Sequence, residues 1–440
     1  MFTSVAWFCN LTGLQPETLA LWFIPIIHVA YALAVYALAK ALKRTPMQAL
    51  AAAFVMEVLN WIGQDYFSPQ AIGLLLAILV LALVFNSRKN VAYAWLSLLP
   101  FFALVITHQL TPYWVCLVVF FGCALKLIKP RYLFLFYGAI ALTWMILHAY
   151  ALGRYGLFNG FDPLSNAERP SYGVMVLGRH ITETAMKVAA VFTWGSSALI
   201  LVIRFFRSRN RKIDVWLPLI ITFSSFVLLG GQNYGGEAIF RVLLYSLPGS
   251  SILIGGALVS ALTWLKTKKW RSTLRLLIAF PLALIITTVG LQAQYGTFFA
   301  NTIDKSADVA FDKIIHTLPV GSYTLAFAPA GPGRKSGEYV AFANKNPMYD
   351  ASLMDFDNMK YLNVNFVDQS TVADMTDELA GLGKPVTLTW TAQMSRMAAY
   401  YGLYPKDAFG NLIRGLEKDG RWSVILKKSD IIVFKLKGTS

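Results

Sequence analysis

Long apolar runs alternate with short polar stretches along the first two thirds of the chain. Because the apolar core of a bilayer is about 30 Å thick, a helix needs roughly 20 mostly apolar residues to cross it. The pattern predicts ten membrane helices, and the shortest runs leave room for one or two re-entrant segments. The predicted segments are 18–40, 47–62, 71–86, 91–107, 113–128, 132–150, 184–206, 214–231, 240–265 and 274–292.

After Gln294 the pattern changes to that of a soluble domain, with frequent charged residues. Helical spacing occurs at 307–316, 392–403 and 406–418, and 323–328 alternates like a strand. The last two predicted strands, 422–427 and 431–436, flank a Lys-Ser-Asp turn and form a hairpin. The hairpin residues expected on one apolar face are Trp422, Val424, Ile432 and Phe434. The sequence thus predicts a membrane domain, 1–292, and a small α/β domain, 293–440.

Composition supports the membrane assignment. The chain is 56% hydrophobic and only 14% charged, whereas a soluble domain is about 45–50% apolar and about 25% charged. This difference excludes an ordinary cytosolic enzyme and a disordered chain. The net charge of +16 does not indicate a nucleic-acid partner, because residues 1–291 hold 23 Lys/Arg against 8 Asp/Glu and residues 292–440 hold 16 against 15.

The positive charges also predict an orientation. Loops on one side of the predicted helices carry 18 Lys/Arg, and loops on the other side carry 4. Since cytoplasmic loops are enriched in Lys and Arg, the basic loops are expected inside the cell. The N-terminus and everything after residue 292 are then outside. The basic clusters lie at 40–44, 88–89, 126–131, 204–212 and 266–275.

An external N-terminus without a preceding helix has two explanations. Residues 1–17 contain no positively charged region of the kind that begins a signal peptide. Either the chain is a piece of a longer protein with helices upstream, or its N-terminus is naturally external.

The first candidate for chemistry is the outer loop 60–70, in which Asp65 is the only charged residue. Glu57 precedes it by eight residues, about two helical turns, so both carboxylates can share one helix face. An outward carboxylate beside aromatic residues suits a general base for a sugar or lipid hydroxyl. It equally suits a cation site, or a helix cap formed by Asp65 and Ser68 before Pro69.

The second candidate is the outer turn 107–113, which contains His108 and Gln109. Pro112 fits the first turn of the next helix, and helix N-termini attract anions. His108 is therefore a candidate phosphate donor. The alternative is a polar turn whose side chains cap two helices.

The third candidate is the glycine-rich outer loop 230–241. Its four glycines allow the backbone to approach a ligand closely. Arg241 can bind a lipid phosphate with two hydrogen bonds, but Glu237 lies four residues before it, at the spacing of a helix-stabilising ion pair. We expect Asp65, His108, Glu237 and Arg241 to face one cavity whose floor includes Glu57.

Other features of the sequence are weaker evidence for a particular function. The long outer loop 151–183 carries charges and aromatic residues that suit sugar stacking or an interfacial belt. No P-loop occurs, and the one Asp-x-Asp sequence, 355–357, is a weak signal.

Three outer-loop strings resemble a known group. They are Asn-Trp-Ile-Gly-Gln-Asp-Tyr-Phe-Ser-Pro-Gln at 60–70, His-Gln-Leu-Thr-Pro-Tyr at 108–113, and Tyr-Gly-Gly-Glu-x-x-x-Arg at 234–241 followed by Leu-Pro. Together with the closing hairpin, they resemble bacterial multi-spanning envelope proteins grouped with GT-C-type glycosyltransferases, which use polyprenyl-phosphate sugars. The resemblance covers most of residues 15–437.

The resemblance implies a GT-C-like fold of about ten transmembrane helices plus a small extracytoplasmic α/β domain, in the bacterial plasma membrane. It implies a glycosyltransferase that moves a sugar from a polyprenyl-phosphate donor to an envelope polysaccharide or glycolipid on the outer face. Its partners would be the lipid-linked sugar, membrane lipids and other envelope-biosynthesis proteins, with no nucleic acid. No nucleotide is expected and no metal ligand is assigned, although a divalent metal remains compatible. The residues expected to be catalytic are Asp65 and Glu237, and those expected to bind substrate or phosphate are Gln64, His108, Gln109, Tyr234 and Arg241.

The chain departs from the group in one respect. GT-C enzymes usually carry the catalytic acidic residue in the first large outer loop, whereas residues 1–17 contain only Glu17. Either an upstream part held that residue, or Asp65 substitutes for it, or the protein is not catalytic. Two other functions stay open: a transporter or flippase for lipid-linked saccharides, in which Glu57 and Lys187 would line the pathway, and a non-catalytic part of a polysaccharide assembly machine.

Overall fold

The structure is a computed structural model. It describes residues 2–150, 175–230, 237–267, 272–329, 331–332, 337–346, 348–355 and 359–438. The chain divides into two compact units, the first formed by residues 1–170 and 184–294 and the second by residues 171–183 and 295–440. Most of the predicted loop 151–183, the residues Tyr234 and Ser336, and part of the Asp-x-Asp sequence lie outside the described residues.

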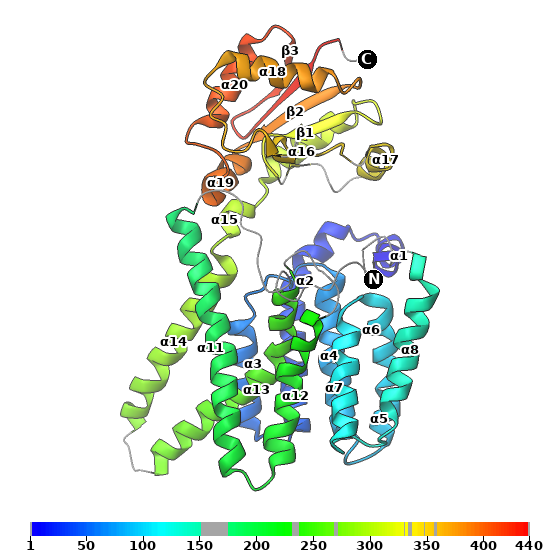
Figure 1. Ribbon diagram of the computed structural model, residues 1–440, viewed down its shortest axis with the longest axis vertical. Coiled ribbons are helices and arrows are strands. Elements are labelled where there is room, and N and C mark those ends of the chain that lie inside the picture. The colour runs from blue at the N-terminus through cyan, green and yellow to red at the C-terminus, as the bar shows by residue number, and fades with distance from the viewer. Residues whose placement is uncertain are drawn as a thin grey trace. The chain divides into compact units, whose positions relative to one another are not determined.

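The described part of the first unit is helical (Figure 1). Its elements are α1 (Phe2–Thr12), α2 (Pro16–Ala41), α3 (Pro46–Leu59), α4 (Pro69–Asn86), α5 (Ala92–Leu96), α6 (Leu98–Thr107), α7 (Thr111–Ala124), α8 (Leu133–Leu147), α11 (Leu177–Arg207), η1 (Lys212–Trp216), α12 (Leu217–Phe223), η2 (Ser224–Gly230), α13 (Ala238–Thr267) and α14 (Ser272–Tyr295). The first residues of α11 belong to the second unit. Each of the ten predicted segments is helical, so the prediction of a mainly helical membrane protein is confirmed.

Within the described residues, six helical stretches are long and apolar enough to cross a membrane. They are Thr18–Ala41, Pro69–Asn86, Leu177–Arg207, Lys212–Gly230, Ala238–Lys266 and Leu276–Asn301. Four predicted segments form shorter apolar helices, and the 14-residue α3 is only about 21 Å long at 1.5 Å per residue.

The largest differences from the sequence predictions concern two helices. Residues 2–12 form helix α1, which was not predicted, and α11 begins at Leu177, inside the predicted loop 151–183. The starts of four other helices follow local signals. Proline occupies the first turn of α2, α3, α4 and α7, where its missing N–H costs no helical hydrogen bond. The predicted cap at Ser68 is present, since its hydroxyl accepts from the N–H of Ala71, and Thr45 and Gln48 form a capping box.

The core of the first unit is built where α2, α3, α4 and α13 pack together. Gly255 of α13 shows how closely the helices approach, because a Cβ there would lie 2.5 Å from the backbone nitrogen of Ala52 in α3. Small residues allow such contacts between membrane helices, whose association depends on close packing rather than on the hydrophobic effect. This packing positions α3, whose C-terminal end leads into the loop containing Asp65.

The second unit is a four-stranded sheet covered by helices on both faces. The strand order is β1-β2-β4-β3, with β1 and β2 parallel and β4 antiparallel to both neighbours. Its elements are α15 (Phe298–Asn301), α16 (Lys305–Ile315), β1 (Tyr323–Ala326), α17 (Gly337–Lys345), η3 (Leu353–Asp355), α18 (Gln369–Ala380), β2 (Val386–Thr391), α19 (Ala392–Tyr401), α20 (Ala408–Lys418), β3 (Trp422–Lys427) and β4 (Ile431–Leu436). The predicted small α/β domain is thus confirmed as a fold.

The closing hairpin is present, and three of the four residues expected on its apolar face are buried. Trp422, Ile432 and Phe434 are buried, whereas Val424 is 42% exposed. Val424 lies directly opposite Phe434, because the register of β3 and β4 shifts only after Val424, so it is on the expected face of the sheet. Because β3 is an edge strand, the exposed side chain has no further strand beside it.

Candidate functional site

A histidine that the sequence analysis did not select lies at the centre of the polar residues. His28 of α2 contacts two carboxylates, Glu57 of α3 and Asp65 of the loop after α3. Its Nε2 lies 2.8 Å from Oδ2 of Asp65, and its Nδ1 is hydrogen-bonded to Oε2 of Glu57. Carboxylates only accept hydrogen bonds, so the imidazolium form, which carries two N–H groups, satisfies both contacts.

Within the described chain, hydrogen-bond donors contact only one of the two carboxylate oxygens of Asp65. Its Oδ2 also accepts a hydrogen bond of 3.0 Å from Nε2 of Gln294, near the end of α14. The side chain is 12% exposed. No hydrogen bond to Oδ1 occurs among the described residues. Asp65 therefore presents one fixed oxygen and one oxygen available to a ligand.

The expected pairing of Glu57 and Asp65 on a helix face is wrong. Helix α3 ends at Leu59, and the chain then turns through Gly63, which has a positive φ of 67°. Asp65 consequently lies in the loop, and the two carboxylates meet through His28 rather than side by side. A signal for His28 was available, because the apolar segment 18–40 contains one histidine, no acidic residue and no other ionisable base except Lys40 at its end, and such residues are functional candidates.

A polar cavity of about 400 Å³ lies next to this cluster along the chain. It brings together the loop before α4, the turn between α6 and α7, and the first turn of α13. Its lining includes Tyr66, Gln64, Gln70, His108, Gln109, Trp144 and Arg241. Gln64 precedes Asp65 directly, so the Cα atoms of these two residues are about 3.8 Å apart.

Arg241 supplies the positive charge of the cavity. Its side chain is 11% exposed, and Nη2 donates to Oε2 of Glu237 at 3.1 Å. The Nε and Nη1 atoms are buried and have no hydrogen-bond partner in the described part of the chain. Since an unsatisfied buried donor costs about 1–3 kcal/mol, more when it is charged, these atoms are suited to an anionic ligand.

The hydrogen bonds around His108 determine which of its ring nitrogens carries the proton. Its Nδ1 accepts from the backbone N–H groups of Leu110 and Thr111, both at 3.2 Å, and lies 2.9 Å from the Thr111 hydroxyl. The proton of the neutral ring is therefore on Nε2. Burial, and then the charge of Arg241, lowers the pKa of His108 to about 4, so the ring is a neutral donor at physiological pH.

The residues expected to face a single cavity thus form two parts of a site. Gln64, His108, Gln109 and Arg241 line the polar cavity, whereas Asp65 and Glu57 bind His28. The two parts meet at the consecutive residues Gln64 and Asp65.

The other predicted site residues lie outside both parts or beyond the described chain. Glu237 is 60% exposed and pairs with Arg241. Tyr234 lies outside the described residues. Lys187, considered for a transport pathway, is exposed on α11. Within the described ranges, no group of three or more His, Cys, Asp or Glu is arranged to hold a metal ion.

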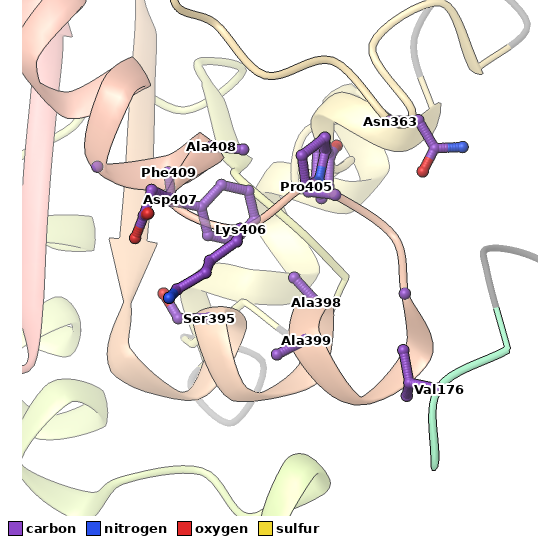
Figure 2. A pocket seen from close by; sticks show the side chains of 13 residues that line it. Val176, Asn363, Ser395, Ala398, Ala399, Pro405, Lys406, Asp407, Ala408 and Phe409 are labelled. Carbon is purple, nitrogen blue, oxygen red and sulfur yellow. The ribbon is translucent and has the colours of Figure 1, made fainter. Parts of the chain in front are cut away.

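A second cavity, of about 580 Å³, lies in the second unit. Figure 2 shows Ala398 and Ala399 of α19 on one side and Lys406 and Asp407, at the start of α20, on another. No predicted site residue lines it.

Comparison with solved structures gives several likenesses, two of which follow. No family model matches the chain, and no curated protein matches it. An oligosaccharyltransferase from Archaeoglobus fulgidus, solved with a tethered acceptor peptide containing the NVT sequon, is similar with a TM-score of 0.47 and 12% identity over 95% of this chain and 62% of that one. ArnT from Cupriavidus metallidurans, bound to undecaprenyl phosphate, is similar with a TM-score of 0.49 and 11% identity over 97% of this chain and 85% of that one.

Both proteins fall within the class that the outer-loop motifs resemble. The chain spans less than two thirds of the length of the oligosaccharyltransferase. At this identity a likeness concerns the fold, and the chemistry of the chain has to come from its own residues.

Proposed function

We propose that the chain is an integral membrane glycosyltransferase. It transfers a sugar from a polyprenyl-phosphate-linked donor to a cell-envelope polysaccharide or glycolipid on the outer face of the bacterial plasma membrane. The observation that carries this proposal is the buried guanidinium of Arg241, with two unpartnered nitrogen atoms, in a polar cavity one residue from the oriented carboxylate of Asp65.

The proposed reaction uses both parts of the site. The donor phosphate binds Arg241 and the Nε2–H of His108. The acceptor hydroxyl attacks the anomeric carbon and gives its proton to Oδ1 of Asp65, while the bond from the anomeric carbon to the phosphate oxygen breaks and its electron pair stays with the phosphate. The phosphodiester becomes a monoester and gains negative charge, which preplaced donors stabilise.

His108 and Glu237 take different roles in this scheme. A neutral His108 donates a hydrogen bond without requiring a charge in a buried turn. Glu237, the second predicted catalytic residue, is mostly exposed and paired with Arg241, so the geometry favours Asp65 as the base and Glu237 as a partner that orients Arg241.

Replacing Arg241 with Lys should reduce sugar transfer about 10- to 100-fold although the charge is kept. Lys cannot form the two parallel hydrogen bonds that a guanidinium makes to phosphate, and losing a charged hydrogen bond costs about 1.5–3 kcal/mol. The measurement is transfer of a radiolabelled sugar from polyprenyl phosphate in proteoliposomes, corrected for protein abundance.

Arg44→Lys is the matched control. The Arg44 side chain is 10% exposed and pairs with one carboxylate, Asp214, at 2.9 Å, as Arg241 pairs with Glu237, but it does not line the cavity. Equal activity of the Arg241→Lys and wild-type proteins would show that Arg241 does not bind the phosphate. A transporter would instead move the lipid-linked sugar across the bilayer without transferring it.

The orientation is a separate prediction. In a protein without Cys9, Cys116 and Cys123, a membrane-impermeant thiol reagent applied outside should label a cysteine at Ser336 and not one at Ser208. Ser208 follows α11 within the basic cluster 204–212, which the distribution of Lys and Arg assigns to the cytoplasm. The reverse labelling pattern would contradict an outer-face reaction.

A further inference from the structure

Two glutamine side chains in the cavity have hydrogen-bonding atoms that the described protein does not use. Gln70 is 3% exposed, and neither its amide oxygen nor its amide nitrogen has a partner in the described residues. The amide oxygen of Gln64 is likewise buried and unpartnered. Both residues line the cavity that contains Arg241.

The position of Gln70 is fixed by the local sequence. Ser68 caps α4 and Pro69 begins it, so Gln70 lies in the first turn of that helix. A buried primary amide has two donor sites and two acceptor sites, and leaving them unsatisfied costs about 1–3 kcal/mol for each lost partner. Such a side chain at the wall of a cavity points to a ligand that both donates and accepts.

The charges around the cavity narrow the class of ligand. Among its described lining residues Arg241 is the one charged side chain, and none is a carboxylate. A phosphate only accepts hydrogen bonds at neutral pH, so it suits Arg241 better than an amide oxygen. A hydroxyl group both donates and accepts, as an amide does. An ammonium group beside Arg241 would find no carboxylate among the described lining residues.

Trp144 completes the wall on the side of α8. An indole face offers apolar contact to the C–H face of a pyranose ring, while its neighbours supply polar contacts at the edge, an arrangement common in small-molecule sites.

From these observations we infer that Gln64 and Gln70 form a sugar-binding subsite that selects an uncharged, hydroxyl-rich sugar over an amino sugar. The inference rests on the proposed function, because it places the sugar of the donor beside the phosphate held by Arg241. Hydroxyl groups of the ring exchange hydrogen bonds with the two amides, and the ring lies against Trp144.

The test compares two synthetic donors on the same polyprenyl phosphate, one with a neutral hexose and one with the corresponding amino sugar. Wild-type protein should transfer the hexose with at least about 10-fold higher kcat/KM, since one lost partner of a buried polar group corresponds to about 10- to 100-fold. Gln70→Leu should lower kcat/KM for the hexose by a similar factor. Gln70→Glu should shift the preference toward the amino sugar, because it supplies the missing carboxylate.

Gln393→Leu is the matched control, because Gln393 is 2% exposed but lies in the second unit and donates to the carbonyl of Ala300. Its hexose-to-amino-sugar ratio should equal that of wild type, and a ratio is independent of protein abundance.

The outcomes separate the two proposals. If wild-type protein transfers neither sugar, the proposed function fails and the subsite fails with it. If it transfers sugar but accepts both donors equally, or if both Gln70 variants keep the wild-type ratio, the function stands and the subsite is overturned.

Discussion

Asp65→Asn should reduce the rate of sugar transfer about 100- to 10,000-fold, the usual contribution of a general base. The replacement keeps the size of the side chain and removes its ability to take a proton. Oδ1 of Asp65 is the oxygen without a hydrogen bond among the described residues, and Oδ2 is held by His28 and Gln294. The measurement is single-turnover transfer with saturating donor, so that chemistry is separated from binding.

Variants of His28 and Gln294, the two residues that hold Oδ2 of Asp65, should reduce the rate of sugar transfer less than Asp65→Asn does. His28→Gln and Gln294→Leu leave the carboxylate in place but remove one of its donors, and they should lower kcat more than they change KM for the donor. Asp214→Asn is the control, because Asp214 pairs with Arg44 away from the cavity. If Asp65→Asn protein retained wild-type kcat, the reaction would need another base and Glu237 would be the next residue to replace.

Gly290→Ala should give the largest loss of stability. Gly290 lies in α14, and a Cβ added to it would be 2.0 Å from the carbonyl oxygen of Val58 at the end of α3. The contacted atom belongs to the backbone, so the two helices must separate. Overpacking costs about 1–3 kcal/mol, occasionally more, and a backbone contact places this site at the upper end. The measurement is the thermal unfolding midpoint of the detergent-solubilised protein.

Gly195→Ala is the matched control for that measurement. Gly195 also lies within a long apolar helix, α11, but no atom lies within 4 Å of an added Cβ. Alanine should therefore raise helix stability there by about 0.5–1 kcal/mol. Gly290→Ala should also lower transfer, because Gln294 lies one turn further along α14 and would move away from Asp65. Equal midpoints for the two variants would show that α14 does not pack on α3 in this way.

The sequence determined the helices and strands wherever a local signal was strong. Apolar runs predicted ten segments that are all helical, and prolines and capping residues set the starts of α3 and α4. The hairpin at 422–436 was predicted at its observed bounds, because alternation and turn residues are local properties. The strand β2 was missed, although its sequence, Val-Thr-Leu-Thr-Trp-Thr at 386–391, alternates apolar residues with threonine as strands do.

The tertiary structure alone decided which polar residues meet. Gln64, His108 and Arg241 were selected from the sequence as candidates, and the packing of three separate helix ends brings them to one cavity. His28 and Gln294 are 37 and 229 residues from Asp65, a separation at which no periodic pattern carries information. The assumption of a continuous helix placed Glu57 and Asp65 on one face, but the chain leaves α3 at Leu59. Local sequence determines where a helix can form. The partners of a charged side chain at membrane depth depend instead on how the helices pack, because each such group needs a polar partner or water inside the bundle.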